Sequence, residues 1–381
     1  MKKIVFYLIV MLTIATSAEL LARISVAFIP ELYDQRDAAL ARIDESTLQK
    51  FVETRANPST GWDNPSGTTV TYKNCLGELN TYTFNPDRTR RHSASAGDAQ
   101  IVIAGDSYTF GEEASDQSTF PAVLENLLNT SVANLGVNGY DPLQSFLRLD
   151  KMINLYPKAR IVILAIMYDD FARLLNGYRP VYFFTSYTGS PYGFKPYLSH
   201  GQLHPLVAPP PWADIKTAWK AANTGFDTDY WRKPKAEFPY VASLVSAIST
   251  NSFYYKFIPS RLYRLLGLPE YQLLLNSVAV QESFTVIIDL LDNLAEQKQL
   301  ATLVALIPRS GADTRSGADL IERIKKQKQH RTELVNIDTD IDWTRYNLKD
   351  DECHPSTYGY EAIAKSIAKS VQRLAASPQA H

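Results

Sequence analysis

The strongest candidate for a reactive residue in the sequence is a serine that closely follows an apolar run. The stretch "IVIAGDSYTFGEE" runs from Ile101 to Glu113 and holds Ser107 between Gly105 and Gly111. A free serine hydroxyl is a weak nucleophile at neutral pH, and it attacks only when a base removes its proton. Ser107 is therefore a candidate nucleophile that needs a base from elsewhere in the chain.

The candidate base is His354, in the C-terminal stretch "DDECHPSTYGYEAIA". Asp351 lies three residues before it and Pro355 directly after it. In an Asp-x-x-His turn the carboxylate can hold one ring nitrogen and stabilise the imidazolium, which leaves the other nitrogen to take the serine proton. Acids before a helix also serve as caps, so this spacing alone does not separate the two roles.

Other residues that could bind a metal or form a disulfide give weaker patterns. His200 and His204 in "HGQLH" have the spacing of two helical ligands, but the internal glycine predicts a loop and no third ligand is near. We therefore expect no metal and no cofactor. Cys75 and Cys353 could pair in an oxidising compartment or remain buried thiols, and both interpretations stay open.

The elements that must position these residues alternate between strands and helices from residue 99 onward. "IVIAG", "RIVILAIM" and "ATLVALIP" are continuous apolar runs, typical of parallel strands buried on both faces. "VANLG" and "ELVNID" predict two more strands, and amphipathic helices separate the runs. The pattern predicts an α/β fold with a doubly wound, mostly parallel sheet flanked by helices.

Together these stretches resemble the SGNH (GDSL-like) hydrolase superfamily, in the form of an envelope-anchored bacterial member. Gly-Asp-Ser after the first strand and Asp-x-x-His-Pro before the last helix are similar to its nucleophile block and its acid and base block. "NLGVNGYDPLQ" is similar to the block whose glycine gives a backbone N–H to the oxyanion hole, which implies that role for Gly139. The resemblance covers most of residues 99–178 and 284–375 and implies an SGNH-hydrolase, flavodoxin-like fold.

One block departs from the family pattern. In "AIMYDDFAR", Asp169 stands where the family has an asparagine whose amide donates to the oxyanion, and Asp170 follows it. An ionised carboxylate at that point would repel the developing negative charge. We expect Asp169 to be protonated, turned away, or replaced by another donor such as Asn138.

The chain is expected to have five parts. Residues 1–28 predict a signal anchor or signal peptide, because Lys2 and Lys3 precede the apolar run "IVFYLIVMLTIATSA". Residues 29–98 form an extension packed on the core, 99–178 and 284–381 the two parts of the SGNH-like domain, and 179–283 an aromatic-rich insertion or lid. The aromatic residues there predict either a satellite core or a sugar-binding wall. The positive-inside rule then places the main domain in the periplasm, anchored in the bacterial inner membrane or released there after cleavage.

These expectations combine into one leading function and two alternatives. A net charge of −1 and the lack of any Lys/Arg-rich run argue against nucleic-acid binding. We expect a periplasmic SGNH-type serine esterase that removes acyl groups, O-acetyl above all, from an envelope or exported saccharide. The alternatives are an O-acetyltransferase using the same acyl-serine, and a non-catalytic saccharide-binding or assembly protein with the same fold. Expected partners are the acylated saccharide, the inner membrane and polysaccharide-assembly proteins.

Overall fold

The chain divides into two compact units, which are described separately. The computed structural model describes residues 2–34, 45–91, 96–177, 194–206, 228–250, 272–311, 314–337, 341–348 and 354–376. The larger unit comprises Lys50–Gly177, Phe194–Ala208 and Pro269–His381, and the smaller comprises Met1–Gln49, Tyr178–Gly193 and Pro209–Leu268.

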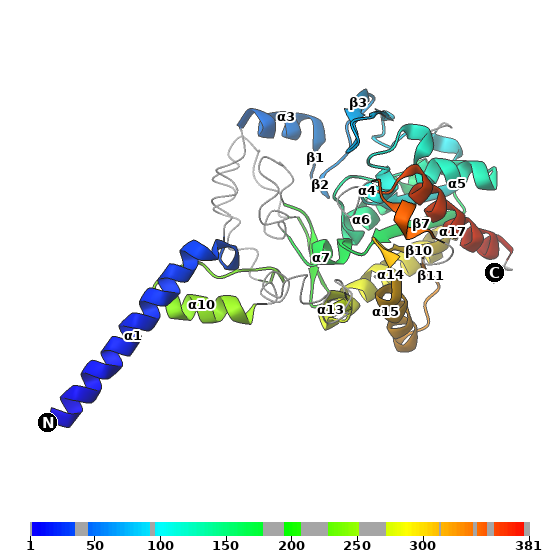
Figure 1. Ribbon diagram of the computed structural model, residues 1–381. Coiled ribbons are helices and arrows are strands. Elements are labelled where there is room, and N and C mark those ends of the chain that lie inside the picture. Colours follow the sequence, from blue (N-terminus) through cyan, green and yellow to red (C-terminus); the bar gives the residue numbers. More distant parts are fainter. Residues whose placement is uncertain are drawn as a thin grey trace. The chain divides into compact units, whose positions relative to one another are not determined.

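A five-stranded parallel sheet forms the centre of the larger unit (Figure 1). Its strands, in spatial order, are β11 (Glu333–Asn336), β10 (Ala301–Ile307), β7 (Ile161–Met167), β5 (Ile101–Gly105) and β6 (Val132–Asn134). Along the sequence, the first strand of this sheet is β5. The chain then forms the edge strand β6, crosses back past β5 to form β7, and continues in the same direction to β10 and β11. The strand order therefore reverses between β5 and β7, which is the place where doubly wound sheets bind ligands. This confirms the predicted fold class and all five predicted strands.

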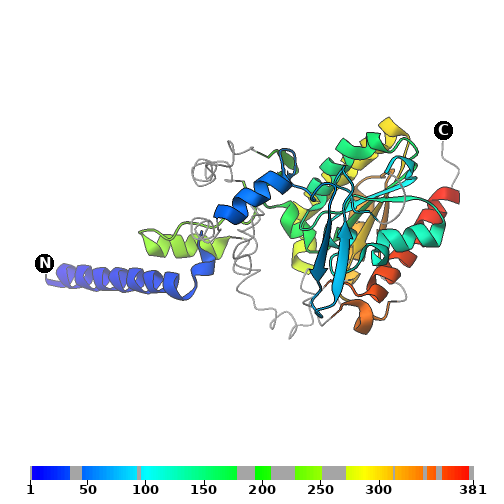
Figure 2. The same cartoon turned by 90° about the horizontal axis from the view of Figure 1, so that it is seen from above.

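Helices cover both faces of this sheet, as Figure 2 shows. The long helices are α5 (Phe120–Leu128), α6 (Pro142–Met152), α14 (Val278–Lys298), α15 (Thr314–Gln327) and α17 (Thr357–Ala376). Helices α5 and α17 pack on each other and close one apolar core, while α6 and α14 pack together over β5, β7 and β10. Short helical elements connect them: η2 (Ala96–Asp98), α4 (Ser107–Phe110), η3 (Asp116–Ser118), η4 (Ile153–Leu155), α7 (Asp170–Leu174), α13 (Gln272–Leu275) and α16 (Trp343–Tyr346).

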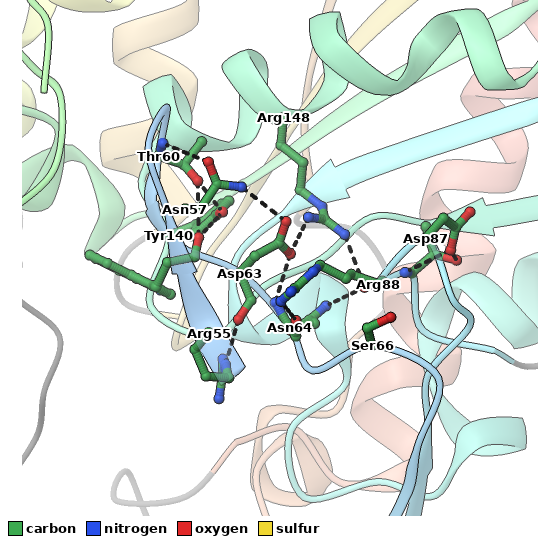
Figure 3. A network of polar contacts seen from close by, with 12 residues as sticks. Arg55, Asn57, Thr60, Asp63, Asn64, Ser66, Asp87, Arg88, Tyr140 and Arg148 are labelled. Atoms are coloured by element: carbon green, nitrogen blue, oxygen red, sulfur yellow. Dashed lines mark hydrogen bonds and ion pairs between the residues drawn. The ribbon is translucent and has the colours of Figure 1, made fainter. Parts of the chain in front are cut away.

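Residues before the sheet form two small antiparallel hairpins that follow α3 (Glu45–Arg55). They are β1 (Ala56–Asn57) with β2 (Gly61–Trp62), and β3 (Thr69–Lys73) with β4 (Leu79–Thr83). The first hairpin and the residue after it are bonded to α6 and the loop before it: Arg148 of α6 forms an ion pair with Asp63, and the Tyr140 hydroxyl donates to Thr60 Oγ1 at 2.8 Å (Figure 3). This segment therefore takes part in the core of the larger unit.

Most of the expected insertion, residues 179–283, lies outside the described residues. Its described parts in the larger unit are a hairpin, β8 (Tyr197–Ser199) with β9 (Gln202–His204), and the stretch that contains α13 and the start of α14. His200 occupies the tight turn with φ +49°, and the His204 ring stacks on Tyr197 with centroids 4.6 Å apart. Helix α14 begins at Val278 and crosses the expected boundary between 283 and 284.

The smaller unit contains α1 (Lys2–Phe28), η1 (Pro30–Leu32) and α10 (Tyr240–Ser249). Helix α1 is 27 residues long, and its length and apolar composition suffice to cross a membrane. Helix α10 packs beside the C-terminal part of α1, where Ala247 contacts a small apolar cluster that includes Leu32 and Tyr33.

Candidate active site

The stretch "GDSYTFG" folds as a strand end, a sharp turn and one helical turn. Asp106 caps α4 by accepting the backbone N–H of Tyr108 at 2.9 Å, so Ser107 opens that helix. A Cβ at Gly105 would lie 2.5 Å from the Ala165 carbonyl oxygen of the neighbouring strand, so only glycine fits there. The nucleophile candidate is thus fixed at the carboxyl end of β5, beside the reversal in strand order.

Ser107 and His354 meet, although they come from opposite ends of the domain. The serine Oγ lies 2.9 Å from His354 Nε2, within hydrogen-bond distance. Ser107 is buried, and the His354 side chain is 27% exposed, which leaves the pair open to a substrate. The backbone of His354 is anchored by its carbonyl, which accepts the N–H of Leu348 at 3.1 Å. The third residue of the predicted set, Asp351, lies outside the described residues.

A carboxylate that the sequence analysis did not single out faces the same histidine nitrogen. Glu112 Oε2 lies 3.2 Å from His354 Nε2. The main chain of Glu112 is held on both sides, because its N–H donates to the Ser107 carbonyl and its own carbonyl accepts the Tyr360 hydroxyl at 2.6 Å. A carboxylate at this distance stabilises the positive charge that His354 acquires when it takes the serine proton.

The loop that carries Glu112 is supported from below by a buried guanidinium. Arg90 is 1% exposed and donates to three carbonyls around the end of α4, those of Phe110, Gly111 and Ala114, at 2.6–2.7 Å. It also pairs with Asp116 at 3.1 Å, which balances its charge. Arg90 comes from the segment before the sheet, so that segment fixes the loop beside Ser107.

Gly139 lies in the loop between β6 and α6, with a φ of +79° that favours glycine. The loop runs alongside the Ser107 turn, because the N–H of Val137 donates to the Gly105 carbonyl at 3.1 Å. A Cβ at Gly136 would lie 2.2 Å from the backbone nitrogen of Phe110, so the loop can approach α4 only with glycine at that position. Asn138, the substitute donor considered above, is in the same loop, and its carbonyl accepts the indole N–H of Trp62 at 3.0 Å.

Asp169 follows β7 and is paired with a cation from the next strand. Its Oδ2 lies 3.4 Å from Arg309 Nη1, and Arg309 follows β10. The Asp169 carboxylate is mostly buried and is balanced by this guanidinium. This pairing reduces the repulsion that an isolated carboxylate would exert on an oxyanion nearby.

Beneath the serine lies a buried group of two acids and one arginine. Arg173 Nη1 contacts Asp170 Oδ1 at 2.6 Å, lies 3.7 Å from Asp106 Oδ2, and donates to the Tyr140 carbonyl at 3.4 Å. The same Asp106 oxygen accepts the Ser107 hydroxyl at 3.3 Å. Arg173 therefore links the serine turn, the loop of Gly139 and the start of α7.

Burial governs the protonation of these two acids. Desolvation raises the pKa of Asp170 well above its ordinary value of 3.8, and the nearby Asp106 adds to the rise while Arg173 opposes it. Desolvation likewise raises the pKa of Asp106, against the opposing effect of Arg173. One guanidinium does not compensate two buried negative charges, so the group holds a proton more readily than exposed acids do.

A test of this group is the pH dependence of stability. Because the folded pKa of Asp170 is raised, the folded chain keeps a proton that the unfolded chain releases above pH 3.8, and stability falls as pH rises from there to the raised pKa. Asp170→Asn keeps an acceptor oxygen and removes the charge, so we expect a smaller fall in melting temperature over this range. Asp150→Asn, an exposed change on α6, should keep the wild-type slope. An unchanged slope in Asp170→Asn would contradict the assignment.

Among known proteins, only solved structures match the chain. No protein-family model and no curated protein matches the chain. A family 3 carbohydrate esterase from Clostridium thermocellum is 16% identical, with 72% of this chain and 96% of that chain covered and a TM-score of 0.34. An acetyl xylan esterase from the rumen bacterium Butyrivibrio proteoclasticus is 10% identical, covering 78% and 66%, with a TM-score of 0.33. A family two carbohydrate esterase from Cellvibrio japonicus is 11% identical, covering 75% and 64%, with a TM-score of 0.33. The chain is similar to these esterases to that extent, and at TM-scores this low the likeness carries no argument about its activity.

Proposed function

We propose that the chain is a serine ester hydrolase of the SGNH type. The observation that carries the proposal is the 2.9 Å contact between Ser107 Oγ and His354 Nε2 at the carboxyl end of β5. A serine within hydrogen-bond reach of an imidazole, on a sharp turn at the reversal point of a parallel sheet, is the arrangement that nucleophilic catalysis requires. The motif resemblance of both stretches supports the same conclusion.

In the proposed mechanism, Ser107 Oγ attacks the ester carbonyl carbon while His354 Nε2 takes the hydroxyl proton. The tetrahedral intermediate collapses as His354 returns that proton to the leaving alcohol, and an acyl-serine remains. Water then gives a proton to His354 and attacks the acyl carbon, and His354 passes that proton to Ser107 Oγ as the acyl–oxygen bond breaks, which releases the carboxylic acid and restores the serine. The Glu112 carboxylate stabilises the imidazolium in both steps, from its position 3.2 Å away.

The oxyanion is assigned to backbone donors in this proposal. The N–H groups of Ser107 and Gly139 would hold it, as the family resemblance implies, and Asp351 would hold the far ring nitrogen of His354. Asp169 does not supply the amide that the family uses, and its role here is to position Arg309 through their ion pair. The proposed site therefore uses fewer side-chain donors than the family pattern, which favours modest hydrolysis rates.

We further propose an acylated saccharide, O-acetyl above all, as substrate, and attachment to the inner membrane with the larger unit in the periplasm. The saccharide rests on the motif resemblance, and the attachment rests on the length and apolar composition of α1 and on Lys2 and Lys3 at its start. Polysaccharide-assembly proteins are proposed as partners on the same basis.

The test uses the full-length chain purified in detergent. We expect a fluorophosphonate probe to label Ser107, acylated saccharide to slow that labelling, and acetate to be released from the saccharide. If the probe labels Ser107 but acetyl groups pass to an added saccharide and little acetate is released, the assigned reaction is acetyl transfer and not hydrolysis. A chain that binds glycan but resists the probe would overturn the catalytic proposal.

A further inference from the structure

Helix α10 in the smaller unit has an exposed apolar stripe that nothing in the proposed catalysis uses. Ser243 and Ala247 are buried on the side of α10 that packs within the unit. Val241, Val245 and Ile248, spaced four and three residues apart, share another face of the helix and are 36%, 61% and 43% exposed. We call these three residues the apolar stripe.

The third face of α10 borders a polar hollow. Ala242 and Ser246 line a hollow together with Arg232, Lys235 and Glu237. Ionic groups of this kind belong in water or at a charged surface. The apolar stripe is therefore bordered on one side by the packed face and on the other by a hydrated, charged face.

A carboxylate from α1 fixes the level at which α10 starts. Glu19 accepts the backbone N–H of Val241 at 3.1 Å and that of Tyr240 as well. These are donors that a helix start leaves without an intrahelical partner, and the helix dipole favours a negative charge there. Arg23, one turn farther along α1, lies with its guanidinium 5.9 Å from the centre of the Tyr240 ring.

This level coincides with the outer edge of a membrane crossed by α1. A hydrocarbon core of about 30 Å takes about 20 helical residues, and counting from Lys3 places its outer edge near Arg23. Glu19 then lies just inside that edge, where a carboxylate is costly unless its acceptors are satisfied. The first turn of α10 satisfies them, so that turn lies at the same depth as Glu19.

Apolar surface continues around this level on both helices. Leu20 and Leu21 of α1 are more than half exposed, and so is Phe238 just before α10. Figures 1 and 2 both show α10 alongside this part of α1. The exposed apolar groups of the two helices therefore gather at the depth where lipid chains meet headgroups.

We propose that the apolar stripe contacts lipid of the outer leaflet, so that a pair of helices, α1 and α10, holds the chain at the membrane. The inference rests on the membrane attachment in the proposed function and adds a second contact to it. The positive groups of Arg232 and Lys235, both exposed, suit the phosphates of the headgroups beside the stripe.

The test compares neighbouring positions on α10 in the full-length chain. Val241→Cys and Ala242→Cys, both at exposed positions, and Leu12→Cys in the middle of α1 are each labelled with an NBD maleimide. The labelled chains are reconstituted into vesicles of phosphatidylethanolamine and phosphatidylglycerol that contain a doxyl-labelled lipid. Cys75 is disulfide-bonded, so the wild-type chain, treated in parallel without reductant, gives the labelling background, and circular dichroism checks the fold of each variant.

We expect a blue-shifted emission that the doxyl lipid quenches at positions 12 and 241, and a less blue-shifted emission with weaker quenching at position 242, which lies at the same depth but faces the charged hollow. If position 12 is quenched while 241 behaves like 242, α1 is an anchor but the lipid contact of α10 is refuted. If position 12 is not quenched, the membrane attachment in the proposed function fails, and this inference fails with it. Neither result bears on the chemistry of Ser107, which the fluorophosphonate assay tests separately.

Discussion

Ser107→Ala is expected to lower kcat/KM for ester hydrolysis by about 10³-fold or more. The variant loses the hydroxyl oxygen that lies 2.9 Å from His354 Nε2, and with it the acyl-enzyme route. Alanine keeps the backbone N–H at this position, so the proposed oxyanion donors stay in place and some rate above that in water should remain. Release of nitrophenol from a model ester, followed at saturating and at low substrate, measures the loss in kcat and in kcat/KM separately.

A matched control separates chemistry from folding. Ser118→Ala changes a half-buried serine of η3 in the segment that follows the same loop and should leave both kinetic constants within about twofold, as surface changes outside a site usually do. The Ser107→Ala chain should also keep its melting temperature to within a few degrees. Wild-type activity in Ser107→Ala would refute the nucleophile, whatever the control shows.

His354→Ala is expected to cost a similar factor, about 10³ or more, because Ser107 then has no base and the leaving alcohol has no acid. The sharper result is the double variant. Two residues that act as one unit give grossly non-additive effects, so Ser107→Ala with His354→Ala should be no slower than the worse of the single variants. The same ester assay measures all three, and His204→Ala, a histidine stacked on Tyr197, serves as the control.

Losses that multiply in the double variant would mean that Ser107 and His354 act independently, which the 2.9 Å contact does not allow for a nucleophile and its base. A small loss in His354→Ala together with a large loss in Glu112→Gln would instead move the role of base to the carboxylate. Glu112 is the candidate for that role because its carboxylate lies 3.2 Å from His354 Nε2, beside the serine turn.

The sheet could be predicted from sequence because its strands carry a local signal. A strand buried on both faces needs a continuous apolar run such as Ile161–Met167. Such a run can be recognised from consecutive residues alone, without knowing what they contact. The pair Ser107 and His354 could also be predicted, since each lies in a short motif at an element boundary. The fold then confirmed the sheet and brought the two residues within 2.9 Å.

The rest of the site has no local signal. Glu112 reaches His354 only because Gly111 adopts a left-handed conformation and turns the chain back after α4. Arg309 reaches Asp169 only because β10 is paired with β7, and strand order is a property of the whole sheet. Charged residues in loops after short helices and after strands are common in sequences, so neither Glu112 nor Arg309 could be singled out before the contacts between distant segments were known.

The burial of Arg90 bears on where the catalytic module begins. A boundary drawn at the first recognisable motif would start the module at the strand that ends in Gly105. It would remove Arg90, whose guanidinium donates hydrogen bonds to three carbonyls in the loop beside Ser107. Left without a donor inside a packed core, such carbonyls destabilise the loop that they belong to. The polar, turn-rich segment must therefore stay joined to the motifs, and a recombined or truncated gene that separates the two would encode a sheet whose loop beside Ser107 has lost its support.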